Sequence, residues 1–192
     1  MLRRHVENDN PAAVGHLGTK YEHGELGLVP SHKKAARLFQ RAADLGDVAA
    51  MNCLGYAYFH GHGVKLDKKK AVKYYRMAAD RGHANAQYNL GNCFERGDGV
   101  AQDDAEAVRF FKLAADQGYE NVLLNLGNMY ATGRGVARAL AEAKRWFARA
   151  AAGWRLVLAG GFSCCACLVA SSSSGILVTS SFVKPFSPWV AC

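Results

Sequence analysis

A block of about 36 residues recurs along this chain, and that period constrains the fold more than any other feature. The two most regular copies start at Ala50 and Ala86, and each reads Ala-x3-Leu-Gly-x2-aromatic-x2-Gly-x-Gly-Val. A third copy starts at Val122 with the same spacing, and an imperfect copy starts at Ala13 with one extra residue before Gly27. A fixed period of this length indicates stacked supersecondary units, each packed on its neighbours, rather than one globular core.

The second half of each unit has its own pattern, in which two bulky residues precede two alanines. The copies of this half start at Ala35, Ala71, Ala107 and Ala143. The first three copies end in Asp-x-Gly, whereas the fourth has Ala152-Gly153-Trp154 there. Apolar residues recur at intervals of three and four, which is the pattern of amphipathic helices. We therefore predict two helices of about 12 and 14 residues in each unit, joined by tight turns.

Glycines and short polar residues mark the expected helix ends. The Gly-x-Gly segment can close the first helix, since glycine adopts the left-handed conformation that other residues resist. The second helix then begins at a good N-cap residue, which is Ser31, Asp67 or Asp103. Ala139 occupies this position in the fourth copy, so we expect its second helix to lack a side-chain cap. The same segments do not fit a dinucleotide-binding site, because that site needs a strand before the glycines.

One glycine lies in the middle of each predicted first helix, at a cost of about 1 kcal/mol relative to alanine. These four glycines are Gly18, Gly55, Gly91 and Gly127. We expect the bare backbone to let an aromatic side chain of a neighbouring helix approach closely. Suitable partners are Tyr75, Phe111 and Phe147.

Together these patterns resemble Sel1-like repeats, which are close relatives of the tetratricopeptide repeat, over residues 10–152. The resemblance implies an all-α, right-handed α-solenoid of four helix-turn-helix repeats. We expect a lead-in at 1–10, repeats at 11–47, 48–83, 84–119 and 120–152 (the last one degenerate), and an apolar, Ser-rich tail at 153–192. It further implies a noncatalytic scaffold or adaptor that binds a protein or peptide on the concave face of the array.

A periodic set of side chains suggests where such a partner binds. The residues just before and after each Leu-Gly pair are three apart, which places them on one helical face. They are His16 and Thr19, Cys53 and Tyr56, Asn89 and Asn92, and Asn125 and Asn128. An amide offers both donors and an acceptor to the backbone of an extended peptide. Our candidate partner-binding residues are Tyr56, Asn89, Asn92, Asn125 and Asn128; alternatively, the asparagines bond only to neighbouring helix ends or water.

Other functional classes find little support in the sequence. No nucleophile elbow, Walker loop or zincin helix occurs, so we expect neither enzymatic activity nor a cofactor. The densest basic cluster, Lys65–Lys73, has no interleaved aromatic residues, so we expect no nucleic-acid partner. His60 and His62, with His23 in the first copy, have no further ligand nearby, so we expect no metal site. We interpret Cys53 and Cys93 as half-buried residues of a reduced intracellular protein.

The chemistry changes after residue 153. No charged residue occurs from Leu156 to Val183, and the apolar stretch at 156–178 approaches the length of a membrane span. Serines and a Gly-Gly pair weaken that interpretation, so three alternatives stay open: an unselected or disordered tail, a membrane anchor, and a packed extension over the last repeat. In the anchored case the protein would be a membrane-associated regulatory subunit, for instance in protein quality control. Because Met1–His5 leads directly into polar residues, we otherwise expect a cytoplasmic protein.

Overall fold

A computed structural model describes residues 9–159 of the chain, with side chains through residue 152. All regular structure in this part is helical. Each of the four repeats has two α-helices, which are α2 (Pro11–His23) and α3 (His32–Asp44), α4 (Val48–His60) and α5 (Lys68–Ala79), α6 (Ala84–Arg96) and α7 (Asp104–Asp116), and α8 (Leu123–Thr132) and α9 (Leu140–Ala159). Short 3-10 helices, η1 (Glu25–Gly27) and η2 (Glu120–Val122), lie in the connections. The prediction of an all-α solenoid of helix-turn-helix repeats is confirmed.

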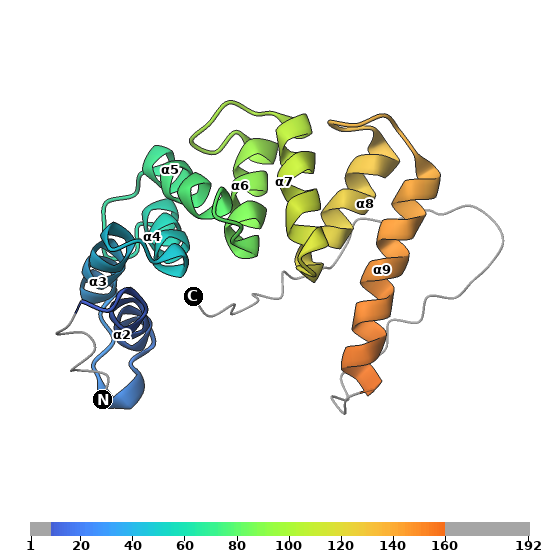
Figure 1. Cartoon of the computed structure of the whole chain (residues 1–192). Helices are drawn as coiled ribbons and strands as arrows, with labels where there is room; N and C mark the ends of the chain where they lie inside the picture. Colours follow the sequence, from blue (N-terminus) through green and yellow to red (C-terminus); the bar gives the residue numbers. More distant parts are fainter. Residues whose placement is uncertain (1–8, 160–192) are drawn as a thin grey trace.

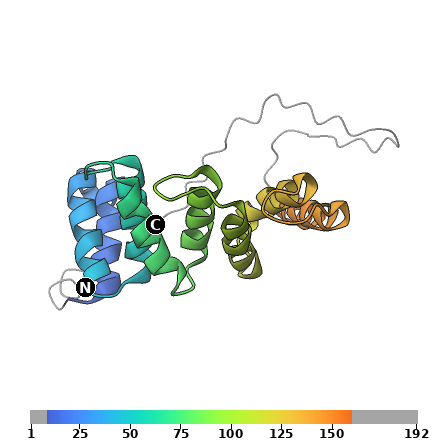
Figure 2. The ribbon, with the colours of Figure 1, turned by 90° about the horizontal axis from the view of Figure 1, so that it is seen from above.

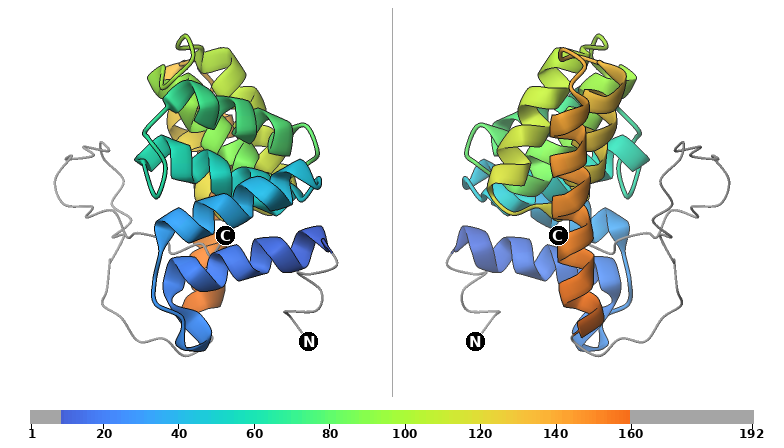
Figure 3. Two further views of the ribbon diagram at one scale, coloured as in Figure 1. Left: turned by 90° about the vertical axis from the view of Figure 1, so that its left-hand side faces the viewer. Right: turned by 90° about the vertical axis from the view of Figure 1, so that its right-hand side faces the viewer.

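The helix pairs follow one another along an arch (Figures 1 and 2). In Figure 1, α2 and α4 lie on the inner side of the arch, while α3 and α5 lie on its outer side. The side views show that α9 is longer than the helices before it (Figure 3). The helices of the first three repeats have 12 or 13 residues, so the two helices of a unit are more equal in length than expected.

The hydrophobic core is one continuous strip that runs through all four repeats. Equivalent residues recur in it, for example the fully buried Leu54, Leu90 and Leu126 of successive first helices. Because each repeat packs on its neighbours along the array, no single centre of the core exists.

The mid-helix glycines are the points of closest helix packing, as predicted. A Cβ atom added to Gly91 would lie 2.6 Å from the ring of Phe111, and one added to Gly127 would lie 2.4 Å from the ring of Phe147. Gly55 meets Tyr75 in the same way, and Gly18 meets Phe39. Any side chain at these positions would displace the aromatic ring or the helix that carries it.

The predicted caps are also present. Ser31, Asp67 and Asp103 accept hydrogen bonds from backbone N–H groups at the start of α3, α5 and α7. The first glycine of each Gly-x-Gly segment closes the preceding helix in the left-handed conformation, for example Gly61 at φ 74°. The second glycine has a different role, which its position in the sequence does not indicate. A Cβ atom on Gly63 would lie 2.2 Å from the carbonyl oxygen of His32, so this glycine lets a loop pack directly on the preceding repeat.

The fourth repeat departs from the others at three points. Its first helix, α8, has only 10 residues, follows η2 directly and has no side-chain cap. Its second helix starts after Ala139, which has no acceptor side chain, as expected. That helix then continues through Gly153 to Ala159 and so crosses the limit between repeat and tail that the sequence suggests.

Candidate functional site

The candidate site consists of the exposed side chains on the first helices of the repeats. Each Leu-Gly pair turns toward the second helix of its own repeat, where Leu90 is fully buried and Gly91 contacts Phe111. The residues on either side of the pair therefore lie at the edge of the buried face. The structure leaves Asn92 and Asn125 half-buried and Asn128 exposed.

The asparagines differ in how their amides are used. The Asn89 amide donates to Oδ1 of Asn52 at 3.1 Å, and Asn52 is only 4% exposed. This bond joins α6 to α4 through a second asparagine side chain, rather than through a helix end or water. The side-chain amides of Asn92, Asn125 and Asn128 make no hydrogen bond to any side chain or backbone group that the structure describes. These three amides retain their full capacity for a partner.

Tyr56 is 38% exposed and lies beside two histidines. Its ring centroid is 4.3 Å from that of His60 and 5.6 Å from that of His62. Burial lowers the pKa of His60, and the nearby His62 and Lys68 lower it further. Tyr56 therefore contributes an aromatic surface at the end of the face where the asparagines are absent.

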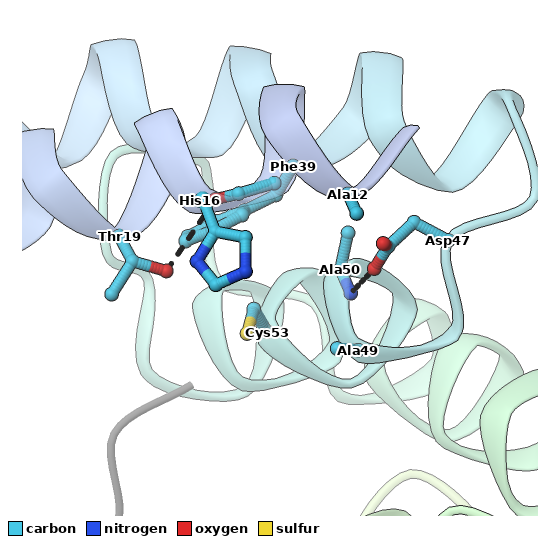
Figure 4. Close-up of a pocket in the computed structure, with 9 residues that line it drawn as sticks. Ala12, His16, Thr19, Phe39, Asp47, Ala49, Ala50 and Cys53 are labelled. Atoms are coloured by element: carbon cyan, nitrogen blue, oxygen red, sulfur yellow. Dashed lines mark hydrogen bonds between the residues drawn. The ribbon is translucent and has the colours of Figure 1, made fainter. Parts of the chain in front are cut away.

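A small pocket separates the first helices of repeats 1 and 2 (Figure 4). His16 and Thr19 of α2 border it, with Cys53 of α4 opposite. Its volume of about 60 Å³ is far below the roughly 300–1,000 Å³ of a typical small-molecule site. The pocket can accept a protruding side chain or a few water molecules, but not a cofactor.

Both repeat cysteines are more deeply buried than predicted. Cys53 is 3% exposed and Cys93 is 1% exposed, so neither is half-buried, and Cys53 does not belong to the exposed face. Burial raises the pKa of the Cys93 thiol to about 12, which suppresses the reactive thiolate. The two residues pack as small apolar side chains.

The lysines of the basic cluster do not all have the same surroundings. In the Lys65–Lys73 cluster, Lys69, Lys70 and Lys73 are exposed at the start of α5, while Lys68 forms an ion pair with Asp98.

The expectation that His62 has no potential co-ligand nearby is wrong. Glu22 and His32, which are distant from His62 in sequence, lie within 4.8 Å of it through their ligand atoms.

The sequence matches the Sel1 repeat over residues 11–47, 48–83, 84–119 and 122–153, which is most of the chain. The chain belongs to the Sel1 repeat family. Sel1 repeats are typically used in protein–protein interaction, and Sel1 repeat proteins are generally noncatalytic scaffolds.

Two solved Sel1-type structures are similar to this chain along most of its length. One is c5321, a protective antigen of uropathogenic Escherichia coli strains with an SLR fold; it is 36% identical and matches 79% of this chain, with a TM-score of 0.76. The other is a Sel1 repeat protein from Oxalobacter formigenes, 30% identical over 75% of this chain, with a TM-score of 0.72. The matched region spans only 32% of the first protein and 58% of the second. No curated protein matches the sequence.

The predicted membrane segment at 156–178 begins in α9, and its residues after 159 lie outside the described part of the chain. Among the residues that the structure describes, no helix is both long and apolar enough to cross a bilayer. Cys164, Cys165 and Cys167, which would be candidate palmitoylation sites of an anchored tail or a fragment of a metal site, also lie beyond the described residues.

Proposed function

We propose that this Sel1 repeat protein is a noncatalytic adaptor that binds an extended segment of a partner protein along its first helices. The observation that supports this most directly is the set of three amides, from Asn92, Asn125 and Asn128, that have no partner within the described structure. Asn92 and Asn128 occupy the same position in successive repeats. A peptide that runs across α6 and α8 would therefore meet the same donor and acceptor pattern twice.

The chemistry of this face favours the backbone of the ligand over its charges. The five candidate residues, Tyr56 and four asparagines, include no Asp, Glu, Lys or Arg. An amide donates to a carbonyl oxygen and accepts from an N–H group, so it can pair with a peptide unit of any sequence. Tyr56 adds a rigid apolar contact with a polar end, a common feature of interface anchors. We expect specificity to come from side chains of the partner that enter the small pocket beside His16 and Thr19.

The experiment compares two triple variants of the full chain. The first changes Asn92, Asn125 and Asn128 to alanine, and leaves Asn89 intact so that the buried Asn52 keeps its partner. The control changes Arg37, Lys73 and Arg109 to alanine; these residues are exposed and occupy one equivalent position on α3, α5 and α7. Peptides selected from a displayed library on the wild-type protein are then measured by calorimetry against both variants.

We expect the asparagine variant to lose at least about tenfold in affinity, because each peptide hydrogen bond contributes about 0.5–1.5 kcal/mol. The control variant should bind like the wild type. Circular dichroism verifies that both variants keep their helices. If the control loses binding and the asparagine variant does not, the partner binds the basic outer face instead, and the proposal is wrong.

Membrane association through residues 156–178 is compatible with this role, because an anchored regulatory subunit could use the same face. Vesicle flotation of the full chain tests it separately from peptide binding. An adaptor that does not float with vesicles and still selects peptides would support the cytoplasmic localisation expected from the sequence over the membrane-associated alternative.

A further inference from the structure

Three positions converge wherever one repeat meets the next. They are the residue two before the first glycine of a Gly-x-Gly segment, the first residue of the second helix in the same repeat, and the residue between the two glycines of the following repeat. The sets are Glu22, His32 and His62 at the first junction, Phe59, Lys68 and Asp98 at the second, and Glu95, Asp104 and Arg134 at the third. The close packing of the second glycine on the preceding repeat brings these side chains together.

The second and third junctions are held by opposite charges. At the second, Nζ of Lys68 lies 2.7 Å from a carboxylate oxygen of Asp98 and also sits over the ring of Phe59. At the third, the guanidinium of Arg134 lies 2.8 Å from Asp104 and 3.3 Å from Glu95. The second helix carries the positive charge at the second junction and the negative charge at the third. The two positions therefore accommodate either arrangement of opposite charges.

The first junction has no such ion pair between its two equivalent positions. His32 and His62 stack with their ring centroids 5.0 Å apart and their planes 28° apart. Nδ1 of His62 is buried and has no hydrogen-bond partner among the described residues. The Glu22 carboxylate completes the group, because one ligand atom from each of the three residues lies within 4.8 Å of the other two.

We propose that this junction is a zinc site that links repeat 1 to repeat 2. Two imidazoles and one carboxylate are a donor set that zinc takes in proteins, with water in the fourth position. The zinc ion would accept one lone pair from the unpaired nitrogen of His62 and another from the imidazole of His32. Zinc here performs the same task as the ion pairs at the next two junctions, since it ties the loop after α4 to the start of α3.

The geometry permits the site to close around a metal ion. Zinc binds imidazole nitrogen at about 2.0–2.1 Å. Ligand atoms that lie within 4.8 Å of one another therefore need at most small side-chain rotations to share one ion. His32 is exposed and Glu22 is half-buried on the last turn of α2, so both side chains can rotate. The close packing of Gly63 on the backbone of His32 holds the backbone at His62 next to the start of α3. His60, whose ring centroid is 5.5 Å from that of His62, lies beside the group but outside it.

The first experiment titrates Zn²⁺ into the full chain by calorimetry, after alkylation of the reactive thiols so that cysteine cannot compete. We expect one equivalent to bind, and the melting temperature to rise, because only the folded protein holds the three ligands together. His62→Ala and Glu22→Gln should each weaken binding by about 100-fold or more, since even an outer partner of a metal site contributes 10–100-fold. His16→Ala is the matched control, because this histidine is exposed on α2 and belongs to no such group among the residues that the structure describes. This variant should bind zinc like the wild type.

A double variant keeps the proposal testable if a single variant unfolds. His32→Lys with His62→Asp introduces the ion pair of the second junction at the first. We expect it to fold, to melt in EDTA no lower than the wild type in EDTA, and to gain nothing from Zn²⁺. If the wild type fails to bind zinc at micromolar concentrations, or if His62→Ala and Glu22→Gln bind it unchanged, the proposal is wrong.

Discussion

Repeats 3 and 4 form the same helix pair from unequal local signals. In repeat 3, His83 caps α6, Asp103 caps α7, and both helices have 13 residues. In repeat 4, α8 has 10 residues with no side-chain cap, and α9 follows an alanine. Yet Gly127 meets Phe147 as closely as Gly91 meets Phe111. The contact between the helices, rather than the signals at their ends, therefore defines the repeat.

The two repeats also differ in how deeply the aromatic partner of the mid-helix glycine is buried. Phe111 is completely buried because α8 packs on the far side of α7. Phe147 is only half-buried, since no described helix follows α9 to cover it. A repeat in the middle of the array gains from both neighbours, whereas the last described repeat gains from one.

The largest loss of stability should come from removing the aromatic ring that contacts the mid-helix glycine. We expect Phe111→Ala to lower the free energy of unfolding by about 3–5 kcal/mol, because it leaves a cavity in the centre of the array. Phe147→Ala should cost less than about 3 kcal/mol, because part of that ring is already exposed to solvent. Urea unfolding followed by circular dichroism measures both. Equal losses would show that repeat 4 is buried by something other than the described helices.

A smaller loss of stability is expected when the glycine that contacts this ring is replaced. Gly91→Leu should cost about 1–3 kcal/mol or more, because its side chain must displace Phe111. The control is Gly15→Ala, also at a helical glycine, where the nearest atoms are 3.7 Å from an added Cβ. This control should be neutral or should stabilise the protein by up to about 1 kcal/mol through helix propensity. Thermal melts of the two variants distinguish close packing from a general effect of removing glycine.

Exchanging the caps tests the local signals directly. Asp103→Ala should destabilise repeat 3 by about 1 kcal/mol, because two N–H groups at the start of α7 lose their acceptor. Ala139→Asp should stabilise repeat 4 by about 0.5–1 kcal/mol if α9 accepts a cap. Both changes are read as shifts in the urea midpoint. A neutral result for Ala139→Asp would place the first residues of α9 outside cap geometry.

The smallest effect concerns pH. Nδ1 of His83 accepts from the N–H of Ala86, which requires a neutral imidazole, and burial lowers the pKa of His83 although Asp47 opposes the shift. Because the folded pKa is below the unfolded value, this stability is complete above about pH 6.5 and is lost as pH falls through the folded pKa.

The matching variant is His83→Asp, which copies the cap of α4. The difference in melting temperature between His83→Asp and the wild type should therefore widen as pH decreases from 7 to 5. A constant difference over this range would mean that the imidazole does not cap α6.

The sequence by itself determined the features that repeat. The period, the helix pairs, the caps at Ser31, Asp67 and Asp103, and the glycine–aromatic partners all follow from identical or chemically similar residues at equivalent positions. The same argument placed the asparagines on the first helices, although it did not show that Asn89 is occupied by Asn52. Periodicity detects what successive units have in common, and local helix chemistry then fixes most of each unit.

Only the tertiary structure decided the features that differ from one repeat to the next. The junction groups consist of different residues each time, so comparing the copies in the sequence hides them. His62 meets Glu22 and His32 because the second glycine brings a loop onto the preceding repeat, across 30 or more residues of chain. The same stacking buries Cys53 and Cys93 completely. Such contacts depend on how two units pack, and a pattern within one unit contains no information about them.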